Sequence, residues 1–134
     1  MTFKYEELEI WKLGVELIAN CYELLRRLPT YERHELASQG RRAVVSVALN
    51  IAEGSGRKTD RDFGAFINRA VSSLLETDAV LKIAIQLGYI KPSDYETVAP
   101  LIEKEFFKLV AFARALQKQP GQRRRYSDEG EETK

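Results

Sequence analysis

The residue types that most often carry catalysis are scarce in this chain, which has one histidine, His34, and one cysteine, Cys21. A carboxylate-bridged di-metal centre in a helical bundle needs paired Glu-x-x-His elements on different helices. One histidine in an expected loop cannot supply them, and His34 has no evident acyl-transfer partner. We therefore expect no metal site, no cofactor and no catalytic residues, so that the protein is not an enzyme.

The segment Gly56-Arg57-Lys58-Thr59 superficially resembles a phosphate-binding loop, but Arg57 stands where a glycine should precede Lys58, and no strand comes before it. Cations and free backbone amides at the start of a helix can nevertheless bind a phosphate group. A solvated loop without a ligand is the alternative. Our nucleic-acid candidates are the basic residues of this loop and of the helices beside it: Arg41, Arg42, Arg57, Lys58, Arg61 and Arg69.

A polar stripe follows the second expected helix, because polar side chains recur there at steps of three or four residues. The stripe consists of Gln39, Arg42, Ser46, Asn50 and Glu53, with Glu76 on the next helix. Since the rest of this helix surface is small and apolar, a hydrogen-bonded network within the bundle or between subunits competes with a plain solvent face. Asp78 is a possible partner for Arg41 or Arg42.

Apolar residues at helical spacing predict four helices, near residues 6–28, 35–53, 60–87 and 94–118. Pro29, the Gly54-Ser55-Gly56 segment and Gly88 separate them. Thr59 with Asp62 and Ser93 with Glu96 predict caps at the last two helix starts, and Pro100 predicts a kink inside the fourth helix. The fold class is therefore an all-α, up-and-down four-helix bundle over residues 1–118.

The first helix has two apolar stripes, which is more apolar surface than one bundle seam requires. One stripe comprises Trp11, Val15, Ile18 and Tyr22, and the other comprises Ile10, Leu17, Cys21 and Leu24. Since soluble monomers rarely expose so large an apolar area, we expect one stripe to contact a second copy of the chain. The second stripe is our candidate for that interface.

Composition narrows the class of protein. With 134 residues the chain has room for one domain, and 21 basic against 20 acidic residues leave no global basic field. A lone cysteine fits a reducing compartment, and neither a signal peptide nor a long apolar segment is evident, so we expect a cytoplasmic location. Residues 119–134 combine Arg123-Arg124-Arg125 with an acidic cluster and are predicted to be a disordered tail.

Several short motifs resemble those of the 23S rRNA intervening sequence protein family, whose members are four-helix bundles. The resemblance covers Phe3 to Leu116, departing at Ser72, Thr77-Asp78 and Pro100. It is carried by Leu8 with Trp11, Leu28-Pro29 with Glu32, Leu36 with Gln39, Arg41-Arg42, Asn50-Ile51-Ala52-Glu53-Gly54, Phe63, Phe66, Ala70, Ser73-Leu74, Glu76 and Leu87-Gly88-Tyr89-Ile90.

This resemblance implies a homopentamer. It also implies a scaffold role, because a related accessory protein of diversity-generating retroelements forms a pentameric barrel that engages a reverse transcriptase and nucleic acid. The family is named for genes found in insertions of bacterial ribosomal RNA genes, which gives a location and not an activity. Two functions follow as expectations: a nucleic-acid or ribonucleoprotein accessory scaffold, or a protein-interaction oligomer without nucleic-acid binding.

Overall fold

Four long helices make up most of the protein. A computed structural model describes residues 1–118, which contain helices and connecting turns but no β-strand. The long helices are α1 (Glu9–Leu25), α2 (Leu36–Ser55), α3 (Asp60–Gln86) and α5 (Ala99–Gln117), and the short helical segments are η1 (Lys4–Glu7), η2 (Thr30–Glu32) and α4 (Pro92–Tyr95). The prediction of an all-helical chain with four long helices is confirmed. The expected tail, residues 119–134, lies outside the described residues.

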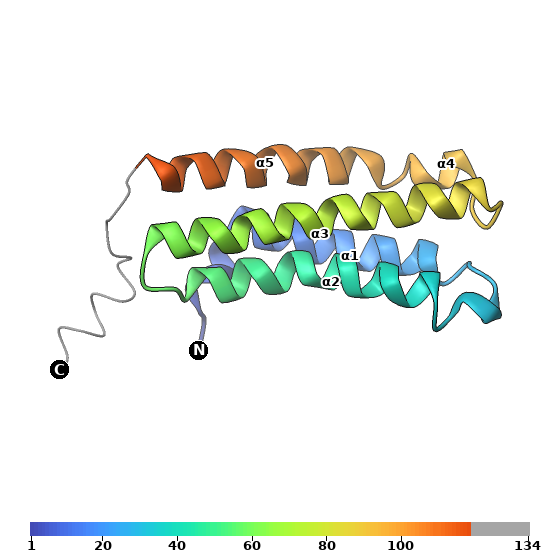
Figure 1. Ribbon diagram of the computed structural model, residues 1–134, viewed down its shortest axis with the longest axis horizontal. Coiled ribbons are helices and arrows are strands. Elements are labelled where there is room, and N and C mark those ends of the chain that lie inside the picture. The colour runs from blue at the N-terminus through green and yellow to red at the C-terminus, as the bar shows by residue number, and fades with distance from the viewer. Residues whose placement is uncertain (119–134) are drawn as a thin grey trace.

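The long helices lie side by side, and helices that follow one another in the chain run in opposite directions (Figure 1). The most extensive packing is between α2 and α3, whereas α1 and α5 share the least extensive seam of the four. Apolar side chains from all four helices meet in one core, and Leu17, Val47, Leu74 and Leu109 are completely buried there. A single chain therefore buries most of the apolar faces of its own helices.

Both ends of α3 form as the sequence indicates. The Thr59 hydroxyl oxygen accepts a hydrogen bond from the Asp62 backbone N–H at 3.1 Å, which caps the first turn. At the other end, Gly88 adopts a φ of 77°, and the Tyr89 N–H donates to the Ala84 carbonyl at 2.9 Å. This hydrogen-bond pattern ends a helix at a glycine with positive φ, because such a residue turns the chain back onto its last carbonyls.

The first expected helix is shorter than predicted, and the fourth is two helices. The chain is extended at Leu8, between η1 and α1. Near the other terminus, α4 ends at Tyr95 and α5 starts at Ala99. Pro100 therefore occupies the first turn of α5, where a missing N–H removes no helical hydrogen bond. The prediction of a kink inside one continuous helix was wrong.

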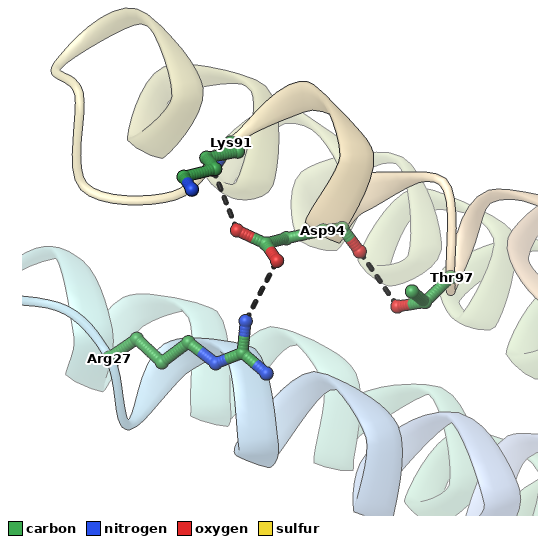
Figure 2. Close-up of polar contacts among 4 residues, drawn as sticks. All are labelled: Arg27, Lys91, Asp94 and Thr97. Carbon is green, nitrogen blue, oxygen red and sulfur yellow. Dashed lines mark hydrogen bonds and ion pairs between the residues drawn. The ribbon is translucent and has the colours of Figure 1, made fainter.

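The start of α4 is capped by Asp94 and not by the expected pair of Ser93 and Glu96 (Figure 2). The Lys91 backbone N–H and the Arg27 guanidinium each donate to the Asp94 carboxylate at 2.8 Å. These contacts, chiefly the one from the Lys91 backbone, hold the pKa of Asp94 below its ordinary value. Asp94 thereby ties the start of α4 to the chain just beyond α1.

Candidate nucleic-acid interface

The six candidate cations lie in two groups. Arg41 and Arg42 are in the first turns of α2, whereas Arg57, Lys58, Arg61 and Arg69 gather around the loop that joins α2 to α3. At 1.5 Å per helical residue, Arg42 and Arg57 are roughly 20 Å apart along the axis of α2. The structure thus divides the predicted set, and we call the second group the loop-end cations.

Two loop-end cations share one aromatic ring. The guanidinium carbon of Arg69 lies 4.5 Å from the centroid of the Phe66 ring, and that of Arg57 lies 5.2 Å from it. Phe66 is only 9% exposed, so its ring is fixed by the packing of α3 against α2. Because a cation over an aromatic face is attracted by the ring quadrupole, Phe66 holds two positive charges near each other at the surface.

The loop-end cations have no acidic partner in the part of the chain that the structure describes. Within residues 1–118 none of the six candidates forms an ion pair with a carboxylate. Lys58 and Arg61 have exposed side chains, and Arg61 also lines a pocket between α3 and the end of α5 that includes Gly64 and Gln117. The acidic residues Glu53, Asp60 and Asp62 are close in the sequence and reduce the net charge of this end.

Arg41 and Arg42 differ in environment. The Arg41 guanidinium donates to the Arg33 carbonyl oxygen at 2.9 Å, which fixes it over the turn before α2. Arg42 is exposed. Neither contacts Asp78, whose carboxylate instead pairs with Lys82 at 2.7 Å and accepts a hydrogen bond from the Tyr95 hydroxyl. The suggested pairing of Asp78 with Arg41 or Arg42 was therefore wrong.

Part of the polar stripe joins α2 to α3. The hydroxyl groups of Ser46 and Ser73 lie 2.8 Å apart, and the Asn50 amide donates to the Ser46 hydroxyl at 2.9 Å. Gln39 donates to the Glu76 carboxylate at 3.4 Å, a long hydrogen bond. By contrast, the side chains of Arg42 and Glu53 are exposed and, within residues 1–118, make no hydrogen bond or ion pair. The stripe is thus a hydrogen-bonded seam at its centre and a solvent face beside it.

The two apolar stripes of α1 also have different environments. The candidate interface stripe is at most 3% exposed and lies in the core of a single chain; it comprises Ile10, Leu17, Cys21 and Leu24. The other stripe is only partly buried, with Val15 43% exposed, and comprises Trp11, Val15, Ile18 and Tyr22. This corrects the assignment made from the sequence: the stripe that its own chain leaves partly exposed is the latter, which we call the outer stripe.

Sequence reasoning missed Glu105, a completely buried acid on α5. Neither carboxylate oxygen has a hydrogen-bond partner within the described residues. Burial raises the pKa of Glu105 to about 8, and Lys108 opposes that rise while Glu9 adds to it. A signal was present in the sequence, because Glu105 falls between Ile102 and Leu109 at the spacing of the apolar stripe.

Cys21 and His34 lie in different environments. Burial, with a smaller contribution from Asp78, raises the pKa of the Cys21 thiol to about 12, so the thiol stays protonated in the core. His34 is exposed in the turn before α2. Residues 1–118 bring together no cluster of three histidine, cysteine or acidic side chains suited to a metal ion, and none of their helices is long and apolar enough to cross a membrane.

Comparisons with known proteins agree with this architecture. A protein of unknown function from the S23 ribosomal protein family of Bacteroides thetaiotaomicron has a similar fold, with a TM-score of 0.70 at 23% sequence identity over 78% of this chain and 97% of that one. A search of curated proteins finds no significant match. Residues 6–110 match the family described as 23S rRNA-intervening sequence protein. The chain therefore belongs to the 23S rRNA-intervening sequence protein family.

Proposed function

We propose that this protein is a non-enzymatic, homo-oligomeric scaffold of the cytoplasm that binds the phosphate backbone of nucleic acid through its loop-end cations. The observation that carries the proposal is the pair of guanidinium groups, Arg57 and Arg69, held over Phe66 without a carboxylate partner in the described residues. Guanidinium groups that are already ordered over a ring lose little further conformational freedom when they meet a phosphate. The family's description names 23S rRNA, which agrees with a nucleic-acid partner and does not choose between RNA and DNA.

The proposed binding should depend strongly on salt and only weakly on the nucleic-acid sequence. Contacts with phosphates give affinity with little sequence preference, and the affinity falls steeply as salt concentration rises. The described residues offer few exposed aromatic rings near this loop for stacking on bases, since Phe66 is itself buried. We therefore expect a weak site in one subunit, and useful affinity only when several subunits engage one strand.

The test is a titration of labelled 12-nucleotide RNA and DNA by fluorescence anisotropy at several salt concentrations. Replacement of Arg57, Lys58 and Arg61 with alanine should weaken binding and lower the salt slope by about 0.7 for each phosphate of a single strand that the variant no longer neutralises. Arg69→Ala should weaken it separately. A matched control replaces the exposed cations Lys12, Lys91 and Lys104, which changes the net charge equally at positions outside the α2–α3 loop. An equal weakening in both triple variants would contradict a defined site.

Assembly is the second part of the proposal, and we propose a homopentamer. The outer stripe of α1 supports self-association, because four large apolar side chains there are incompletely covered by their own chain. The number five comes from the resemblance to the family, and a closed ring is the symmetry that allows an odd number of subunits.

The alternative function is a protein-interaction oligomer that binds no nucleic acid. It is favoured by a second apolar surface, the groove between α3 and α5, where Leu75 is 54% and Phe107 is 62% exposed. An oligomer that shows no salt-dependent binding of either RNA or DNA in the titration above would support this alternative and overturn the nucleic-acid proposal.

A further inference from the structure

The least expected group in the protein is the Glu105 carboxyl, which lies inside the bundle at the seam between α1 and α5. It is 0% exposed, and neither of its oxygens has a hydrogen-bond partner in the described residues. A buried polar group without a partner costs free energy, and a buried charge without one costs considerably more. The position therefore strongly favours the neutral, protonated carboxyl.

Gly14 on α1 makes room for this carboxyl. A methyl group at Gly14 would lie 3.2 Å from Glu105 Oε2, and 3.8 Å from side-chain atoms of both Val47 and Ala48 on α2. A glycine inside a helix is less favourable than alanine, because its backbone loses more conformational freedom. The contact between α1 and α5 thus contains two residues that each lower stability, a buried acid and a helical glycine opposite it.

Few charges can compensate an ionised Glu105. Lys108 lies one turn further along α5 and lowers the pKa of Glu105, but its ammonium group is bound to Glu9 on α1 at 3.2 Å, and Glu9 acts in the opposite sense. From α2, the neighbours around Gly14 are the apolar side chains of Val47 and Ala48. An ionised Glu105 would consequently gain more from leaving the core for water than from any partner now beside it.

The fold permits such a departure. The packing of α1 against α5 is the least extensive among neighbouring long helices, but α5 also packs on α3 over a larger contact, which its release would break as well. A break at Glu96–Val98 separates α5 from α4, and α4 is held independently by the contact between Arg27 and Asp94 (Figure 2). Because α4 and α5 are not one continuous helix, opening of α5 need not carry α4 with it.

We propose that Glu105 is a proton-controlled latch, which holds α5 in the bundle while it is protonated and releases α5 when it ionises. The direction follows from the pKa, which is raised from an ordinary value of 4.5 to about 8 in the packed state. Packing of α5 is therefore strongest below pH 4.5, weakens as the pH rises from there, and reaches its minimum above pH 8. Between these limits the equilibrium constant for release should rise about tenfold for each pH unit.

Hydrogen exchange measured by mass spectrometry between pH 5.5 and 7.5, corrected for the intrinsic exchange rate, tests the latch. Peptides from α5 should show an opening constant that rises about a hundredfold over this range, while peptides from α2 and α3 should show a much smaller rise. In Glu105→Gln the α5 slope should disappear, since the amide does not ionise. Glu103→Gln, which replaces an exposed acid on the same helix, should leave the slope unchanged.

Three results would overturn the latch. The first is an α5 slope that persists in Glu105→Gln, and the second is a wild-type protein without any slope. The third is an equal slope in α2, α3 and α5, because that would show a pH-dependent unfolding of the whole domain and no separate release of α5. Glu105→Met provides a second variant without either polar oxygen, and it should also lack the slope.

Discussion

Gly54 on α2 lies directly against Phe66 on α3, so closely that a methyl group on Gly54 would come within 2.6 Å of the Phe66 Cβ. The same methyl group would lie 2.8 Å from Cδ1 of Phe63. Real Cβ atoms do not approach other atoms so closely. Here the neighbouring atoms are the buried ring of Phe63 and the Cβ of Phe66, which cannot move aside easily. The end of α2 therefore packs on α3 through a glycine, and any larger residue must push the helices apart.

Gly54→Ala should destabilise the protein by about 1 to 3 kcal/mol, the usual cost of overpacking a core. The matched control is Gly64→Ala in α3, where a methyl group would meet nothing within 4 Å and alanine favours the helix. That variant should be neutral or more stable by up to about 1 kcal/mol. Urea unfolding followed by circular dichroism measures both, and similar effects at the two glycines would contradict the close packing.

Asp94 gives a prediction of pH dependence. Its pKa is lowered by the Lys91 backbone hydrogen bond and by Arg27, so its contribution to stability is present above the ordinary value of 3.8 and is lost as the pH falls through the lower folded value. Asp94→Asn should therefore lower the thermal midpoint at pH 7 and should differ less from wild type near pH 3. A difference that grows with acidity would contradict this assignment.

The Ser46 and Ser73 contact should be measurable by a double-mutant cycle. Ser46→Ala should cost about 1 to 2 kcal/mol, because it also removes the acceptor of the Asn50 amide. Ser73→Ala should cost less. A coupling energy of about 0.5 to 1.5 kcal/mol between the two substitutions is expected, and additive effects would show that the hydroxyl groups are solvated independently.

Assembly can be tested at Val15, which lies at the centre of the outer stripe and is 43% exposed. Val15→Asp should lower the mass measured by light scattering, from about five chains toward one, without loss of helical circular dichroism. Ser72→Asp, an exposed position on α3, is the control and should leave the mass unchanged. Assembly that survives Val15→Asp would direct attention to the groove of Leu75 and Phe107.

Helical periodicity predicted the four long helices, and the turn residues predicted where α3 begins and ends. The division of the last helix was missed because the helical spacing of apolar residues continues from Tyr95 through Val98 to Ile102, across the break. Pro100 was in fact the signal, since proline is favoured in the first turn of a helix as well as at a kink. The structure places Pro100 in the first turn of α5.

The candidate site was predicted less well than the fold. Spacing shows which side chains share a face of a helix, but it does not show which face the neighbouring helices cover. The buried stripe of α1 was therefore taken for the exposed one. The placement of Arg57 and Arg69 over the Phe66 ring depends on the turn between α2 and α3, so residue spacing could not predict it. Glu105 was passed over because a single acid within an apolar stripe is commonly exposed at its edge.

The loop-end cations occupy one end of the bundle, where α2 turns into α3 (Figure 1). Rotation about a single axis leaves the height of every atom along that axis unchanged, so any cyclic assembly of this chain would carry all of its loops at one level. Each subunit would add the same four positive side chains to a common rim. A strand that crossed several subunits would then bind by avidity, with each further contact made at high effective concentration. A dimer of such rings with dihedral symmetry would instead present two rims, and could hold two strands or bridge distant parts of one.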